Sequence, residues 1–253
     1  MNQNIIKKRD LIAVFFRSFL IQAVWNFKSL VSVGMCFALV PVARRLCEKK
    51  RICTKFLKRH LYFFNSHPFF ASYALGAITR LEEDRVKGII KDEAQIENFK
   101  NALIGPLGAI GDQYFWASIK PGAILVGLTG ATLFRDFYWQ LFFLAISLLL
   151  YNAPHFYIRA LGLWRGYREG YAIVKHLKME KFSTVSKVYL FIGALMLGLL
   201  SGFRGGMFSA QNVSAVVVFV VSAGLVFLLR RSNVSLYLAL TIVIVMALFI
   251  GII

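Results

Sequence analysis

Residues 105–112 carry the sequence GPLGAIGD, which places three glycines and a proline within a single short stretch. Its flanks are strongly apolar, with Leu103 and Ile104 before it and the aromatic run YFW at 114–116 after it. Glycine and proline destabilise the interior of a helix, so this composition predicts a break in the helix. Broken backbone at membrane depth is tolerated only where protein or a water-filled cavity covers it. The stretch therefore predicts an interrupted helix inside a membrane protein, a pattern that also points to the binding sites of transporters.

The composition of the whole chain supports this membrane assignment. Of 253 residues, 58% are hydrophobic and 15% aromatic, and the mean hydropathy is +0.64. This exceeds what a soluble domain of that length can bury, so much of the apolar surface is expected to face lipid. We predict an all-α integral membrane protein with interfacial amphipathic helices, broken or re-entrant helices in the middle, and about three C-terminal spans. The expected spans are 188–203, 213–229 and 234–253.

Two further apolar blocks, residues 122–134 and 141–151, are each shorter than the ~20 residues that cross the hydrocarbon core. They are expected to form a hairpin or tilted, partly buried helices. The chain is divided on these grounds into N-terminal interfacial helices at 1–60, a transport core with broken helices at 61–187, and C-terminal transmembrane helices at 188–253.

The net charge of +18 requires an anionic partner or surface. Nucleic acid and phospholipid are the two candidates. The basic residues gather between apolar blocks, as expected of cytoplasmic loops, and this pattern favours anionic phospholipid over nucleic acid. Arg230 and Arg231 predict a cytoplasmic turn between the last two spans, which leaves the C-terminus outside and the N-terminus in the cytoplasm. The expected cytoplasmic stretches are 44–59, 80–100 and 152–187.

Polar side chains with carbohydrate-binding chemistry stand beside the predicted breaks. Pro68 breaks the apolar stretch FFNSHPFF at 63–70. Amides and carboxylates hydrogen-bond the hydroxyls of a sugar, and an aromatic face covers its C–H side. A sugar site is one interpretation, and the capping of exposed backbone at broken helices is the other. The candidates are Asn65, His67, Asp112, Gln113 and Trp116.

Glu82 and Glu83 are adjacent carboxylates after an apolar run. Such a pair suits acid–base chemistry or a cation. Because Arg80 and Arg85 lie alongside, a solvated ion-pair cluster is the favoured alternative.

No catalytic residues, metal site or cofactor site is predicted. The chain contains no nucleophile elbow, P-loop or dinucleotide fingerprint. Cys47, Cys53, His60 and His67 are spaced by six or seven residues and lack the tight pairs of known zinc sites. The odd set of three cysteines implies no disulfide framework.

A series of short strings gives the chain a family resemblance. They occur in this order: RSF at 17–19, QA at 22–23, WNF at 25–27, RHL at 59–61, FFNSHP at 63–68, LEE at 81–83, GPL at 105–107, GD at 111–112, FW at 115–116, and Pro121. Together they resemble component IID of the mannose-type (mannose/fructose/sorbose/N-acetylgalactosamine) sugar phosphotransferase system, over nearly the whole chain.

This resemblance implies a multi-pass protein of the bacterial inner membrane that is not an enzyme by itself. It implies a IIC membrane partner, soluble IIA and IIB components that deliver the phosphoryl group, and a trimer of IIC–IID pairs. A hexose or amino sugar is expected to bind between the two membrane components. Carried over by match, the residues expected to form or brace that site are Asn65, Glu82, Glu83, Asp112 and Trp116, joined by His67 and Gln113.

Two departures from the family pattern leave alternatives open. Lys28 occupies a position that is usually acidic in such proteins, and residues 202–212 are shorter than the polar insertion that they usually carry. A non-transporting scaffold or docking subunit, or a divergent and partly degenerate paralogue, is therefore the second hypothesis.

Overall fold

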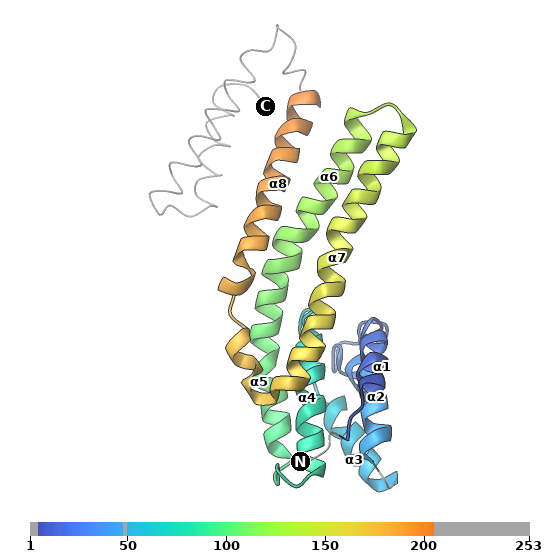
Figure 1. Cartoon of the computed structure of the whole chain (residues 1–253), viewed down its shortest axis with the longest axis vertical. Coiled ribbons are helices and arrows are strands. Elements are labelled where there is room, and N and C mark those ends of the chain that lie inside the picture. Colours follow the sequence, from blue (N-terminus) through green and yellow to red (C-terminus); the bar gives the residue numbers. More distant parts are fainter. Residues whose placement is uncertain (1–4, 48–49, 205–253) are drawn as a thin grey trace.

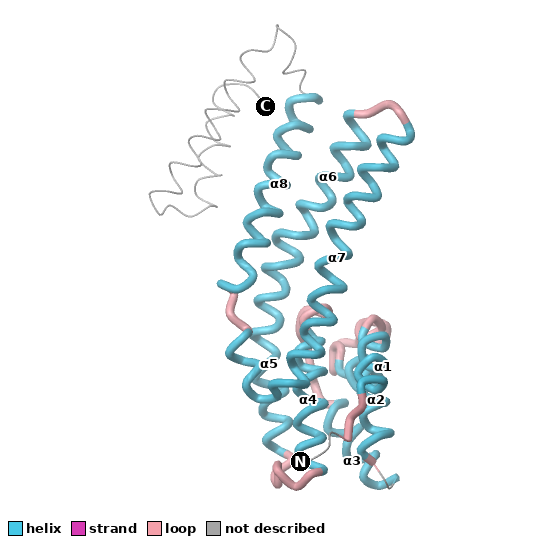
Figure 2. Tube along the Cα trace, viewed as in Figure 1, coloured by secondary structure: helices cyan, strands magenta, loops and turns pink. Residues whose placement is uncertain are grey.

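The computed structural model describes residues 5–47 and 50–204, and this part of the chain is helical, without strands. Figure 2 shows that loops occur mainly at the ends of the helices. The elements in chain order are α1 (Lys8–Ser18), α2 (Ser32–Leu46), α3 (Lys50–Leu61), α4 (Ala71–Val86), α5 (Ala94–Gly111), the π-helix η1 (Asp112–Ile119), α6 (Lys120–Leu133), α7 (Phe137–Glu169), the 3₁₀-helix η2 (Gly170–His176) and α8 (Glu180–Arg204).

The molecule is elongated, with long helices at one end and a cluster of shorter ones at the other. Helices α6, α7 and α8 run side by side along the long axis, while α1 to α4 gather around the lower half of α7 (Figure 1). Helices α5 and α6 continue into each other through η1 and form one long rod. The all-α prediction is confirmed.

The predicted helix break at residues 105–112 is wrong. Pro106 lies inside α5, and the chain remains helical from Ala94 to Leu133. Leu103, Leu107 and Ile110 share one buried face of α5, and burying such side chains stabilises by about 1.5–3 kcal/mol each. This burial outweighs the low helix propensity of glycine and proline. What remains of the interruption is the change to π-helical geometry at η1, immediately after the last glycine.

The expected hairpin of residues 122–134 and 141–151 is present, but its arms are longer than predicted. Helices α6 and α7 are joined by a short turn in which the carboxylate of Asp136 accepts hydrogen bonds from the backbone N–H groups of Tyr138 and Trp139, at 3.0 and 3.2 Å. Gly130 allows the arms to approach closely, because a Cβ there would lie 2.0 Å from the Cβ of Phe143. Residues 141–151 thus lie in the N-terminal half of a long helix and do not form a short one.

Two helices of the described chain are long and apolar enough to cross a membrane. They are the continuous helical segment Phe137–His176 and the segment Glu180–Leu200. Within the most apolar stretch of each segment, only 6% of the first and 22% of the second is buried inside the chain. The second contains the predicted span 188–203 almost entirely. The other two predicted spans, 213–229 and 234–253, lie outside the described residues.

Helix α4 is the buried centre of the lower half and packs most extensively on α7. Small residues make this contact close. A Cβ at Gly76 would lie 2.2 Å from the carbonyl oxygen of Leu163, and one at Gly166 would lie 2.4 Å from the carbonyl oxygen of Tyr73. The two backbones therefore touch, which fixes the position of the C-terminal part of α4 with its two glutamates.

The N-terminal helices form a layer against α4 and α7. Residues 44–59, expected as a cytoplasmic stretch, are divided between the end of α2 at Leu46 and α3, which begins at Lys50. On α1, Ile12 and Phe16 are exposed while Leu11 and Val14 are buried, so the helix has apolar side chains on both faces. The interfacial position expected for residues 1–60 stays a prediction.

Candidate functional site

The loop between α3 and α4, which carries Asn65 and His67, is held in place by a second loop. The backbone N–H of Val31 donates to the carbonyl oxygen of Phe64 at 3.1 Å. The turn that presents Val31 is organised by Asn26, whose side-chain oxygen accepts hydrogen bonds from the N–H groups of Lys28 and Ser29, at 3.1 and 2.9 Å. The WNF string thus positions the FFNSHP string, although the two are far apart in the sequence.

His67 anchors this loop on the long α5–η1–α6 rod. The His67 ring is stacked on the Phe115 ring with 5.1 Å between centroids. A Cβ at Gly111 would lie only 2.1 Å from the Cβ of His67. The backbone N–H of Phe69 donates to Nδ1 at 3.3 Å, so the ring proton is assigned to Nε2. This Nε2 is buried and has no partner among the described residues. Gly111 is required here because only glycine lets the loop approach the helix so closely.

The π-helix presents polar groups beside this contact. Asp112, Gln113 and Trp116 are exposed, and the ammonium group of Lys120 lies 4.5 Å from the centroid of the Trp116 ring. Trp116 also contacts the His67 ring, with 5.2 Å between centroids. The structure therefore brings His67 next to η1, which carries the three exposed candidates Asp112, Gln113 and Trp116.

Asn65 is exposed and lies two residues before the buried His67 on the same loop. No hydrogen bond or ion pair to another described residue holds its amide. Its side chain is thus available on the loop that packs against η1.

Glu82 occupies a different environment from the one predicted. Its side chain is 0% exposed, so the expected solvated ion-pair cluster is wrong for this residue. One carboxylate oxygen accepts from Nε of Arg59 and Nε2 of His60, both at 2.8 Å. The other accepts from Nη2 of Arg59 at 3.1 Å and Nε of Arg85 at 3.0 Å. The C-terminal turn of α4 is tied in this way to α3.

These contacts control the protonation of Glu82 and His60. Burial raises the pKa of the Glu82 carboxyl, but the hydrogen bonds from His60 and Arg59 outweigh it and hold that pKa at about 2. Burial lowers the pKa of His60, so the imidazole is neutral and donates its Nε2 proton to Glu82. Glu82 is thus an ionised carboxylate whose charge is compensated by Arg59 and Arg85.

Glu83 is also fully buried, with its own set of partners. It accepts hydrogen bonds from the backbone N–H of Ile5 at 2.6 Å and from the hydroxyl of Tyr167, and it pairs with Lys87 at 2.8 Å. Burial raises the pKa of its carboxyl, but the hydrogen bonds from Lys87 and Tyr167 outweigh it and leave that pKa lowered. Glu83 therefore joins the N-terminus, α4 and α7. No hydrogen bond or ion pair links either glutamate to the candidates on the 65–67 loop and η1.

The histidines, cysteines and carboxylates of the described chain form no cluster of three or more that is arranged to hold a metal ion. The chemistry available at the 65–67 loop and η1 is that of amide, carboxylate and aromatic groups, which suits the recognition of a neutral polyhydroxylated ligand.

Comparison with known proteins identifies the family. The model for the IID component of the mannose/fructose/sorbose family of the phosphotransferase system matches residues 5–203. The chain belongs to this family. The mannose-specific EIID component of Escherichia coli K12 is 33% identical over 196 residues, which are 77% of this chain and 68% of that protein. The sorbose-specific EIID component of Klebsiella pneumoniae is 30% identical over 200 residues, or 79% of this chain and 71% of that protein.

The fold of this IID-family chain also occurs in a solved transporter. A chain in the cryo-EM structure of the mannose transporter ManYZ in complex with microcin E492 superposes with a TM-score of 0.61 at 26% identity. The alignment covers 98% of this chain and 95% of that chain. The membrane assignment made from composition is thereby supported by both sequence and fold.

Residues that organise this IID-family chain were missed in the sequence. Lys100 ends the charged stretch 80–100 that was expected in the cytoplasm, yet its side chain is 0% exposed, and its ammonium group donates to the carbonyl oxygens of Arg59 and Tyr62 at 3.0 and 3.4 Å. Arg159 belongs to the expected cytoplasmic stretch 152–187, but it is buried within α7 and donates to the carbonyl and hydroxyl oxygens of Ser18. A lysine or arginine has no sequence signature for burial, because the same residue serves at the surface. Asn26, which organises the turn before Val31, could have been found from its place in the WNF string.

Proposed function

We propose that this chain is a membrane subunit of a sugar phosphotransferase system that translocates a hexose or amino sugar together with a IIC partner. Soluble IIA and IIB components phosphorylate the sugar as it arrives in the cytoplasm. The family match and the similarity to a chain of the ManYZ mannose transporter support this proposal. In this arrangement the chain itself performs no catalytic step, and a trimer of IIC–IID pairs is the proposed assembly.

The observation that carries the proposal is the juxtaposition of the 65–67 loop with η1. An exposed carboxylate, an exposed amide and a half-exposed indole lie on one short helical segment, with a second exposed amide on the loop that packs against it. Carboxylate and amide groups hydrogen-bond sugar hydroxyls, and the indole face covers the C–H side of the ring. We assign sugar contacts to Asn65, Asp112, Gln113 and Trp116, and a positioning role to His67.

Glu82 and Glu83 are proposed to brace the site and not to touch the sugar. Each carboxylate is fully buried and already accepts hydrogen bonds from several groups of the chain. A sugar hydroxyl would have to displace a charged arginine or lysine to reach either one, which is unfavourable in a buried setting.

The same proposal includes an orientation in the inner membrane. Trp139 is exposed at one end of α7 and Trp164 at the other, and at 1.5 Å per residue the two are separated by roughly 38 Å along the helix. This distance exceeds the ~30 Å of the hydrocarbon core, which supports an orientation with one indole at each interface. Because the basic residues gather at the Trp164 end, we place that end, with the N-terminus, in the cytoplasm, and the C-terminus outside. The basic surface faces anionic phospholipid.

Uptake of labelled sugars by cells that lack their own system tests the proposal. The chain is expressed with its neighbouring IIC component and compared with the double variant Asn65→Ala/Asp112→Ala. A matched control, Glu97→Ala/Asn101→Ala, removes one carboxylate and one amide from α5. We expect at least about 10-fold slower uptake in the first variant, because a buried ligand hydroxyl loses its partners, and normal uptake in the control.

The outcome also separates the proposal from the scaffold hypothesis. A scaffold would retain full uptake when Asn65 and Asp112 are both alanine, provided the variant still co-purifies with IIC. Cells that express IIC alone give the baseline. Uptake that is identical with and without this chain would refute the transport role altogether.

A further inference from the structure

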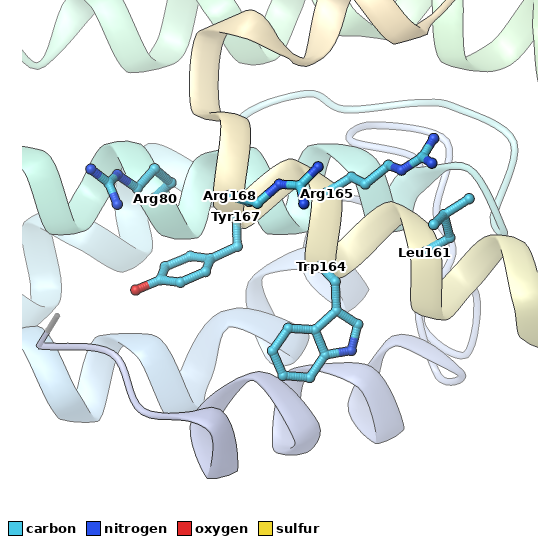
Figure 3. Close-up of a pocket in the computed structure, with 6 residues that line it drawn as sticks. All are labelled: Arg80, Leu161, Trp164, Arg165, Tyr167 and Arg168. Carbon is cyan, nitrogen blue, oxygen red and sulfur yellow. The ribbon is translucent and has the colours of Figure 1, made fainter.

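A basic pocket outside the proposed sugar site lies where α7 approaches α4 (Figure 3). Its volume is about 590 Å³. Arg80 comes from α4, and the remaining lining residues come from the C-terminal part of α7. The lining residues are Arg80, Leu161, Trp164, Arg165, Tyr167 and Arg168.

The pocket has an excess of positive charge. Three of its lining residues are arginines and none is a carboxylate. The guanidinium group of Arg80 pairs with Asp84 at 3.0 Å, and that of Arg168 is 76% exposed and pairs with the adjacent Glu169 at 3.3 Å. Arg165 forms no ion pair with any residue that the structure describes. Figure 3 shows that the side chains of Arg165 and Arg168 extend in the same direction, with the guanidinium group of Arg165 beyond that of Arg168, while Arg80 extends the opposite way. Each guanidinium group presents several N–H donors, which suits an anionic phosphate group.

The surroundings of the pocket are apolar on the side facing the long helices. The preceding part of α7 exposes large apolar side chains, among them Leu148, Leu149 and Phe156. Trp164, which lines the pocket, is 41% exposed, as expected of an indole at a membrane interface. The arginines are therefore located where the hydrocarbon-facing surface of α7 ends.

We propose that this pocket binds the phosphate group of an anionic phospholipid, with Arg165 and Arg168 contacting the phosphate and the acyl chains lying along the apolar surface of α7. The proposal rests on the membrane orientation given above. A free phosphate ion would bind through the same arginines, but it has no apolar group to pack against Leu161 and Trp164. A phospholipid binds more tightly, because the burial of its acyl chains adds to the charge interaction of its phosphate group.

Native mass spectrometry of the full chain, purified with its IIC partner, tests the assignment. The probes are dioctanoyl phosphatidylglycerol, dioctanoyl phosphatidylcholine and inorganic phosphate. In the variant Arg165→Gln/Arg168→Gln we expect phosphatidylglycerol to bind about 30-fold more weakly, from about 1 kcal/mol for each arginine. The matched control Lys175→Gln/Lys178→Gln removes the same charge from exposed sites outside the pocket and is expected to bind normally.

A second variant, Leu161→Trp, fills the pocket and keeps both arginines, so weaker phosphatidylglycerol binding in this variant supports the site independently of charge. Equal binding by the native chain and the arginine variant overturns the proposal. So does equal binding of phosphatidylcholine, or displacement of the lipid by an equal concentration of inorganic phosphate. Sugar uptake is measured separately on the native chain, so a failure of the transport role is distinguished from a failure of this lipid site.

Discussion

Substitution of Gly111 by alanine is expected to destabilise the protein by displacing the loop that carries Asn65 and His67. The new Cβ would lie 2.1 Å from the Cβ and 2.5 Å from the Cγ of His67. Carbon atoms in contact are about 3.5–4.0 Å apart, so the loop must move by roughly 1.5 Å. Overpacking of this kind costs about 1–3 kcal/mol, whereas alanine gains about 0.5–1 kcal/mol in helix propensity. The net expectation is a loss of about 1–2 kcal/mol.

Gly108 provides the matched control on the same helix. A Cβ at Gly108 meets no atom of the described chain within 4 Å, so Gly108→Ala is expected to keep only the propensity gain of about 0.5–1 kcal/mol. The two variants are compared by thermal unfolding in detergent extracts of membranes, followed by size-exclusion chromatography of a fluorescent fusion. The midpoint should fall for Gly111→Ala and rise or stay unchanged for Gly108→Ala.

Sugar uptake completes the comparison. Because displacement of the loop moves Asn65 away from η1, uptake by the Gly111→Ala variant should fall further than the amount of folded protein does. Equal melting points and equal uptake for the two alanine variants would refute the close packing of His67 on the α5–η1 rod. They would also remove the geometric basis for a shared site.

The ion network at the end of α4 gives two further expectations. Glu82→Gln should destabilise the protein by about 3 kcal/mol, because Arg59, which is only 6% exposed, and Arg85 would lose their buried counter-charge and keep only the half-exposed Glu93. The exposed Glu180→Gln should cost less than 1 kcal/mol in the same thermal assay, and similar midpoints for both would contradict this. The pKa of Glu82, held at about 2, lies below its unfolded value of 4.5, so its contribution is complete above pH 4.5 and is lost as the pH falls toward 2. Melting points measured from pH 3 to 7 should therefore fall less steeply for Glu82→Gln than for the native chain, and parallel curves would count against the network.

Local patterns predicted the helical class and the membrane environment correctly, but they failed at residues 105–112. The sequence there contains every signal for a broken helix, yet Leu107 and Ile110 continue the buried stripe of α5 and the helix runs on. Propensity is a property of the isolated segment, whereas the burial of α5 depends on α4 and the 65–67 loop. The stabilisation from burying these side chains exceeded the cost of placing glycine and proline in a helix.

The sequence supplies the candidate residues, whose role in sugar binding stays a prediction, but it does not show which of them lie together. The strings that contain Asn65 and Asp112 are visible in the sequence, and the structure brings their segments together through His67 and Gly111. Glu82 was predicted from the same kind of string, but its burial was not, because the partners that neutralise it come from α3.

Composition, charge distribution and the ordered strings were enough to establish an all-helical membrane protein of a recognisable family, because hydrophobicity and charge act on each segment independently of its neighbours. The tertiary structure alone decided that α5 continues through its glycines into α6. It also decided that Lys100 and Arg159 are buried and that the arginines of α7 line a pocket with Arg80. These outcomes depend on contacts between residues from distant parts of the chain. Such contacts form only on folding, so their energies cannot be inferred from a local sequence pattern.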